Sequence, residues 1–112
     1  MISAYEDMGL DYDMNKAWFV GILEGEGCFS LKNDKYISIA VEMTDLDVIT
    51  KLKELSGVGK IHMRTKRGGR KQSWIWTVAT RPDVEHILQL TKHMFSQRRR
   101  EQINYLLQAT TL

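Results

Sequence analysis

Three glycines lie within seven residues of an otherwise apolar segment, FVGILEGEG (residues 19–27), that has the pattern of a helix. Each glycine inside a helix costs about 1 kcal/mol relative to alanine, so a helix that carries several of them needs a reason. Ala17, Gly21 and Gly25 recur every four residues and form one stripe of minimal side chains. Such a stripe lets another backbone approach closely, a rule best known from membrane helices. It predicts close packing within the chain or, since the other sides of the helix are also apolar, between two copies.

Two glutamates stand in the last turn of the same segment. Glu24 and Glu26 lie where the helix dipole is negative, which disfavours a carboxylate by roughly 0.3–1 kcal/mol. They therefore require a compensating cation. This cation is either a Lys or Arg partner or a hard divalent metal held by carboxylate and backbone carbonyl oxygens. If two such helices pair through the stripe, their acidic ends lie side by side, and the repulsion between them favours the metal.

The rest of the chain alternates strand-like and helix-like patterns. Residues 28–32 and 35–43 predict a hairpin around Asn33-Asp34, and residues 60–66 and 73–78 predict a second one around Gly68-Gly69. Helices are expected over residues 45–56, ending at Gly57, from Pro82 onward, and after residue 96. The apolar positions expected to face the core in these elements include Leu46, Ile49, Leu52, Leu55, Ile61, Met63, Trp74, Trp76, Val78, Leu90 and Met94.

The element order is therefore αββαββα with a C-terminal helix. Residues 1–13 are expected to be an N-terminal tail and residues 14–112 a single domain, with Asp13 or Asn15 capping the first helix. Because each strand has one apolar face, we expect an α+β fold in which a four-stranded antiparallel sheet carries its helices on one face. The other face is then open, polar and mostly basic.

The charge and the cysteine content limit the classes of protein to which this chain can belong. After Asp13 the chain has 16 basic and 10 acidic residues, which indicates a polyanionic partner. The single cysteine, Cys28, excludes an intramolecular disulfide and a multi-cysteine zinc site. No apolar run approaches the roughly 20 residues that span a bilayer, and the acidic first 13 residues do not resemble a signal peptide. We therefore expect an intracellular protein with no membrane partner, and the sequence leaves the compartment open.

Residues 19–27 resemble, position for position, the signature of the LAGLIDADG homing endonucleases. The likeness extends over residues 15–109: the αββαββα order, GVGKI before the third strand, WxWxV in the fourth and QRRR at the start of the last helix. This resemblance implies a homodimer whose motif helices pair at its centre and whose saddle-shaped sheets enter the major groove of double-stranded DNA. It also implies Mg²⁺-dependent hydrolysis of one phosphodiester bond on each strand of a long, partly palindromic site, the reaction of intron homing.

The resemblance assigns roles along the motif helix. Glu26 matches the metal-binding acid and the Gly25 carbonyl matches its backbone companion. Glu24 matches the first acid, whose place is structural. Together with the stripe of Ala17, Gly21 and Gly25 it is expected at the dimer interface.

The catalytic set that the resemblance implies departs from the family pattern in two places. Arg98 is nearest to the position of the family's catalytic lysine, with Arg99 second. Arginine keeps the charge there but cannot transfer a proton at neutral pH. Where the family often has a water-orienting glutamine, this chain has Glu42 or Met43.

The DNA contacts are expected on the outer face of the sheet and on the KRGGRK loop. They are Cys28, Ser30, Lys32, Tyr36, Ser38, Lys60, His62, Arg64, Lys66, Arg67, Arg70, Lys71, Ser73 and Thr77. Two alternatives remain open at this point. One is a catalytically lapsed DNA-binding protein or RNA-binding intron maturase of the same fold, and the other is a structural module that the glycine stripe merely dimerises.

Overall fold

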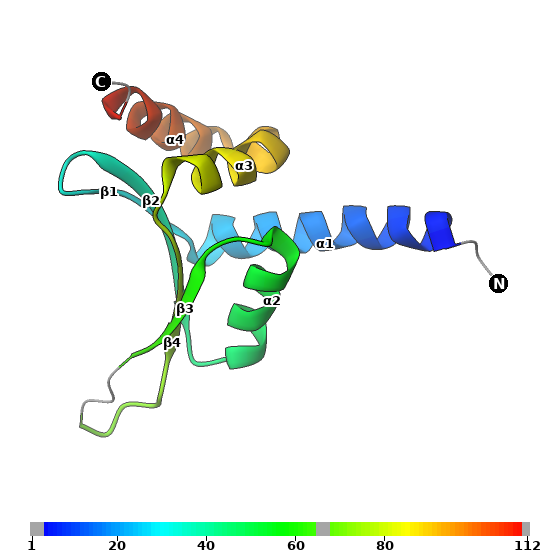
Figure 1. Cartoon of the computed structure of the whole chain (residues 1–112), viewed down its shortest axis with the longest axis horizontal. Helices are drawn as coiled ribbons and strands as arrows, with labels where there is room; N and C mark the ends of the chain where they lie inside the picture. The colour runs from blue at the N-terminus through cyan, green and yellow to red at the C-terminus, as the bar shows by residue number, and fades with distance from the viewer. Residues whose placement is uncertain (1–3, 65–67, 111–112) are drawn as a thin grey trace.

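The computed structural model of the chain describes residues 4–64 and 68–110, and residues 4–12 by their backbone alone. Its elements follow the expected order (Figure 1). They are α1 (Ala4–Glu26), β1 (Cys28–Lys32), β2 (Tyr36–Met43), α2 (Leu46–Ser56), β3 (Lys60–Met63), β4 (Trp74–Val78), α3 (Arg81–Thr91), a 3₁₀ turn η1 (Lys92–Met94) and α4 (Gln97–Ala109).

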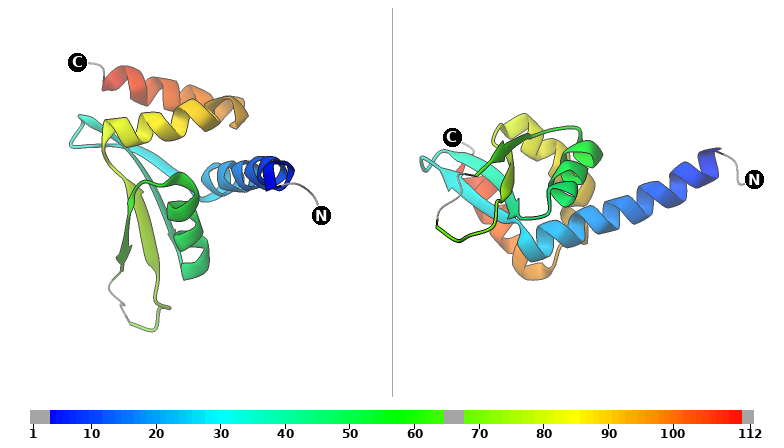
Figure 2. Two further views of the ribbon diagram at one scale, coloured as in Figure 1. Left: turned by 45° about the vertical axis from the view of Figure 1, so that its right-hand side comes forward. Right: turned by 90° about the horizontal axis from the view of Figure 1, so that it is seen from below.

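The four strands form one antiparallel sheet in the order β1-β2-β4-β3. Each hairpin contributes a neighbouring pair, and β2 joins β4 at the centre. The helices lie on one side of this sheet, with α2 and α3 against the central strands and α4 against β1 (Figure 2). The predicted α+β architecture is thereby confirmed. No helix in the described part of the chain is long and apolar enough to cross a membrane.

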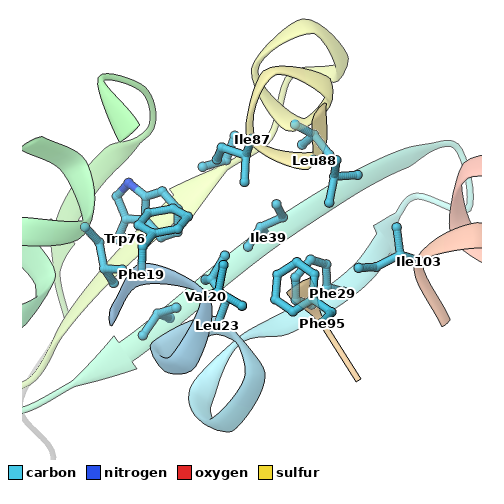
Figure 3. Packing of buried hydrophobic residues seen from close by; sticks show 14 of the residues in the cluster. Phe19, Val20, Leu23, Phe29, Ile39, Trp76, Ile87, Leu88, Phe95 and Ile103 are labelled. Atoms are coloured by element: carbon cyan, nitrogen blue, oxygen red, sulfur yellow. The ribbon is translucent and has the colours of Figure 1, made fainter. Parts of the chain in front are cut away.

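The core lies between the sheet and the helices. Trp76 from β4 is fully buried and meets Phe19 from α1 edge to face, with ring centroids 5.9 Å apart. Phe29 from β1 meets Phe95, in the link between η1 and α4, in the same way at 5.7 Å, so aromatic pairs join α1 and this link to two strands (Figure 3). Leu23, fully buried beside them, holds the C-terminal half of α1 against the sheet. The packing thus fixes the end of α1, where the two glutamates stand.

Several predicted element boundaries are confirmed by backbone geometry. Asn33 and Asp34 both have positive φ, at 54° and 56°, as the two central residues of a tight hairpin turn require. Gly57 ends α2 in the left-handed conformation with φ 72°, and its N–H donates to the carbonyl of Lys53. Pro82 lies in the first turn of α3, where its missing N–H leaves no helical bond unmade.

The prediction for the start of α1 is wrong. The helix begins at Ala4, so neither Asp13 nor Asn15 caps it and most of the expected tail is helical. Residues 4–13 contain no proline and one glycine, and therefore nothing that forces a helix to end there. The N-terminal half of α1 extends well beyond the rest of the molecule (Figure 1).

The second hairpin also differs from the prediction. The strands β3 and β4 are separated by residues 64–73, so Gly68-Gly69 is not a two-residue turn between paired strands. Near the strand ends, the Arg64 N–H donates to the Ser73 carbonyl at 2.9 Å and the Gln72 side chain donates to the Arg64 carbonyl at 2.5 Å. The loop is thus closed at its base by backbone and side-chain bonds.

Five predicted core positions are instead exposed. Ile49 and Leu52 are fully buried, but Leu46 and Leu55 lie near the two ends of α2, and Met63 ends the edge strand β3. Side chains at element ends extend past the layer that would cover them. The exposed apolar residues that the periodicity assigned to the core are Leu46, Leu55, Met63, Leu90 and Met94.

Candidate functional site

The small-residue stripe of α1 faces solvent. Ala17, Gly21 and Gly25 are all exposed, and a Cβ added at Gly21 or Gly25 would find no atom within 4 Å. Nothing in the described part of the chain therefore requires glycine at these two positions. The alternative in which the stripe packs within the same chain is wrong, and the predicted dimer interface is an open surface.

Glu24 at the end of this stripe is already neutralised by the chain itself. Its carboxylate accepts the backbone N–H of Ser96 at 2.5 Å and lies 3.5 Å from Nε of Arg99. The hydrogen bond from the Ser96 backbone is the main cause of a pKa below the usual range of a glutamate, and the Arg99 charge adds to it against the opposing effect of burial. The salt-bridge partner expected from the sequence is therefore found for Glu24.

Glu26, two residues later, is in a different state. It is the last residue of α1 and is exposed, and within the described residues its carboxylate makes no hydrogen bond or ion pair. The two acids that the sequence places side by side thus have separate environments. Glu24 is tied to α4, and Glu26 is left open.

Arg98 and Arg99, the two candidates for the catalytic cation, are separated by the fold. Arg98 is exposed on the first turn of α4. Arg99 is 8% exposed, donates to the carbonyls of Glu24 at 3.0 Å and Gly27 at 3.3 Å, and lies 4.9 Å over the Phe29 ring. The run of three arginines does not by itself indicate which one is enclosed, because the partners of Arg99 lie 72 to 75 residues away along the chain.

The oxygen atoms left free at the end of α1 fit a hard divalent cation. The Leu23 carbonyl accepts the Gly27 N–H at 3.0 Å and the Glu24 carbonyl accepts Arg99. The Gly25 carbonyl accepts no hydrogen bond from the described residues, which leaves it with the Glu26 carboxylate as an oxygen pair of the kind that Mg²⁺ and Ca²⁺ bind. Among the residues described, no three His, Cys, Asp or Glu side chains cluster as a metal site. The described part of one chain therefore offers only part of a coordination sphere.

The outer face of the sheet carries a groove of about 570 Å³, and four of its ten lining residues are Lys or Arg. Its lining residues are Lys32, Glu42, His62, Met63, Arg64, Arg70, Lys71, Ser73, Ile75 and Thr77. Most of these are among the predicted DNA contacts, and the lining as a whole comes from all four strands and the β3–β4 loop. The groove is the open, basic face that strand alternation predicted.

The other predicted contacts lie outside this lining. Cys28, Tyr36 and Lys60 are exposed on the strands and Ser30 is half-buried. Ser38 is 2% exposed, so its prediction as an exposed contact is wrong: its short side chain on a central strand lies beside Ser30, with the two hydroxyls 3.3 Å apart. Lys66 and Arg67 lie outside the described residues.

Glu42 is the one acidic residue of the groove lining. Its carboxylate accepts the Ser73 hydroxyl at 2.9 Å and lies 3.4 Å from Nε of Arg64. Along β2 it stands two residues beyond Ala40, the partner of Cys28, so it lies at the end of the sheet at which α1 joins β1. This position keeps Glu42 a candidate for orienting a water molecule, and its two partners fix the carboxylate in the groove.

Comparison with solved structures agrees with this architecture. The homing endonuclease I-TnaI is similar with a TM-score of 0.62 and 17% identity over 83% of this chain and 69% of its own. I-CvuI, solved in complex with DNA, is similar with a TM-score of 0.66 and 18% identity over 88% of this chain and 67% of its own. The LAGLIDADG meganuclease I-CpaMI, bound to uncleaved DNA, is similar with a TM-score of 0.68 and 18% identity over 84% of this chain. The matched region spans about a third (35%) of I-CpaMI. No protein-family model and no curated protein matches the sequence. The chain has the LAGLIDADG homing-endonuclease fold, as the motif predicts.

Proposed function

We propose that this chain is a site-specific, metal-dependent DNA endonuclease that acts as a homodimer. The observation that carries the proposal is the juxtaposition at the end of α1. An exposed stripe of small residues ends in an unpaired Glu26 carboxylate and Gly25 carbonyl, and the same chain presents a basic groove on its sheet. Within the described residues nothing covers the stripe, and no hydrogen bond or ion pair engages the Glu26 carboxylate or the Gly25 carbonyl. The three parts suit three different partners: a second copy for the stripe, a divalent cation for the oxygens and a polyanion for the groove.

In the proposed dimer the stripes of two copies form the interface, and the two helix ends together complete the metal site. Packing the stripe of one copy against that of another lets the two helix backbones approach closely, because Gly21 and Gly25 present no side chain. The two Glu26 carboxylates then lie near one another at the symmetry axis. Their combined carboxylate and carbonyl oxygens supply the ligands that one chain lacks.

The groove is proposed to bind the major groove of duplex DNA, which is about 12 Å wide and admits β-structure. Arg70, Lys71 and Lys32 supply cations for backbone phosphates, which give affinity and salt dependence. His62 and Thr77 project from neighbouring strands and are suited to hydrogen bonds with base edges.

For the reaction, the Glu26 carboxylate and the Gly25 carbonyl would hold Mg²⁺. When bound, this ion polarises a phosphate and makes a neighbouring water more acidic. Arg98, exposed on the first turn of α4, is the candidate for stabilising the charge that develops on the phosphate, and as an arginine it does so without giving up a proton. Glu42, held by Ser73 and Arg64, is the candidate that orients the attacking water.

A second candidate, a DNA- or RNA-binding protein of this fold without cleavage, is favoured by one observation. Arg99 is enclosed and Glu42 is paired with Arg64, so two of the four predicted catalytic side chains already have partners in the chain. This candidate shares the dimer and the basic groove with the first and differs only in the chemistry.

A selection on a randomised duplex-DNA library separates these candidates. We expect Mg²⁺ to yield a partly palindromic cut site and Ca²⁺ to yield retention of the same sequence without cutting. Retention in both metals without any cutting would refute the nuclease and support the binding protein. No retention in either metal would refute the nuclease and the DNA-binding protein, and would leave an RNA-binding protein or a dimerisation module.

A further inference from the structure

Arg99 donates hydrogen bonds to the backbone on both sides of the proposed metal ligands. Its Nη2 donates to the Glu24 carbonyl at 3.0 Å and to the Gly27 carbonyl at 3.3 Å. These two carbonyls flank Gly25 and Glu26 directly. One guanidinium from α4 thus spans the short stretch of α1 that carries both candidate ligands.

A neighbouring set of contacts holds the guanidinium in this position. Gln102 accepts Nη1 of Arg99 at 2.7 Å and donates to the Phe29 carbonyl at 3.3 Å. The Phe29 ring lies under the guanidinium, 4.9 Å away, and Ser96 donates its backbone N–H to Glu24. The first turns of α4 therefore contact the junction of α1 and β1 through both side chains and backbone.

The burial of Arg99 marks it as more than a surface ion-pair partner. Its side chain is 10% exposed, whereas arginine is rarely enclosed because removing its charge from water is expensive. Nη1 and Nη2 donate to partners in the chain, and Nε, which makes no hydrogen bond, is buried 3.5 Å from a carboxylate oxygen of Glu24, so the group is not presented to a ligand. Ile103 and Leu106 already anchor α4 in the core, and docking of the helix does not depend on the arginine alone.

We infer that Arg99 is a positioning residue that fixes the Gly25 carbonyl and the Glu26 carboxylate in the orientation in which they bind a divalent cation. The inference rests on the proposed function and assigns to Arg99 a role different from contact with the scissile phosphate. Residues that orient metal ligands typically change metal affinity or activity by about 10–100-fold when they are replaced. Loss of Arg99 is therefore expected to weaken metal use while leaving the ligands themselves in place.

The test compares Arg99→Met and Arg99→Lys with Arg100→Met, an exposed control in the same turn of α4. In Arg99→Met we expect the Gly27 amide, which donates to Leu23, to exchange its hydrogen about tenfold faster without metal or DNA. Terbium ions, used as a luminescent probe with the selected DNA, should bind about 10–100-fold more weakly. The Mg²⁺ concentration for half-maximal cleavage should rise in proportion, with the rate at saturating Mg²⁺ largely restored. Arg99→Lys should fall between, because a lysine has no planar fork with which to bridge two carbonyls.

Other outcomes would overturn the inference. Loss of cleavage at every Mg²⁺ concentration, with terbium binding and amide exchange unchanged, would make Arg99 a direct contact to the reacting phosphate. Unchanged values in all three measurements would leave it a helix-docking residue without a role at the site. If the wild-type protein does not cleave, the proposed nuclease fails, while amide exchange and terbium binding still decide the role of Arg99. If Arg99→Met does not fold, Arg99→Lys provides the same measurements.

Discussion

Replacing Gly21 by alanine should stabilise the isolated chain and at the same time weaken the dimer. In the middle of a helix, alanine is favoured over glycine by about 1 kcal/mol. The added Cβ would find no atom within 4 Å, so nothing within the chain offsets this gain. For a domain of this size, 1 kcal/mol corresponds to a rise of about 4 °C in the unfolding midpoint.

The same methyl group has the opposite effect in a dimer that packs through the stripe. There, each copy inserts a methyl between two closely spaced backbones, and overpacking typically costs about 1–3 kcal/mol per site. Since the symmetric interface contains the residue twice, we expect a loss of about 2–6 kcal/mol, which weakens association about 30-fold or more. The proposed assembly would thus account for a glycine at position 21, where the described part of the chain does not require one.

Two measurements separate these effects. Urea unfolding at protein concentrations below the dissociation constant reports the stability of the monomer, and sedimentation equilibrium reports the dimer. The matched control is Gly69→Ala, a loop glycine with equally open surroundings that lies off the stripe and should leave the dimer unchanged. A Gly21→Ala protein that is more stable and dimerises as well as the wild type would refute the proposed role of the stripe.

Further predictions concern the fold and the groove. Gly59→Ala should destabilise the chain by about 2–4 kcal/mol, because its φ of 93° is left-handed and a Cβ would collide with the Trp76 indole and the Thr77 carbonyl. Gly57→Ala, with φ 72° but open space, should lose only about 1 kcal/mol, and equal losses in urea unfolding would contradict the steric argument. Replacing both Arg70 and Lys71 by alanine removes four cations from a dimer on DNA. The slope of log affinity against log salt concentration should then become shallower by about 3–4, and an unchanged slope would show that these cations do not contact phosphates.

Local sequence signals determine much of this fold. Asn33-Asp34, Gly57 and Pro82 end or begin elements through their own backbone preferences, so their positions could be predicted without knowing the tertiary structure. Alternation of apolar and polar residues likewise predicted the covered and open faces of the sheet. The same rule failed at Ser38, because alternation predicts the face of the sheet on which a side chain lies but not how far the neighbouring side chains cover it.

The features that the sequence did not reveal depend on distant parts of the chain. The N-terminal half of α1 lacks the regular apolar period from which a packed helix is recognised, although its residues permit a helix. The contacts of Arg99 with Glu24 and Gly27, and of Ser96 with Glu24, join α4 to α1 across more than 70 residues. A run of three arginines gives no indication of which one turns inward. The Ser96 side chain accepts the Arg99 N–H and caps α4. This cap is a local signal that sets where α4 begins, and the start of the helix determines which of the three arginines lies on its inward side.

The most direct test of the account is single-turnover cleavage of the selected duplex by Glu26→Gln, beside the wild type and Glu54→Gln, an exposed glutamate on α2. Removing the one unpaired carboxylate at the end of α1 removes the side-chain ligand for the metal but leaves the stripe and the groove intact. We predict that Glu26→Gln dimerises and binds the duplex in Ca²⁺ as the wild type does, while cleavage in Mg²⁺ falls at least about 100-fold. Glu54→Gln should cut normally. Cleavage by Glu26→Gln at the wild-type rate would contradict the assignment of this carboxylate, and with it the proposed nuclease site at the end of α1.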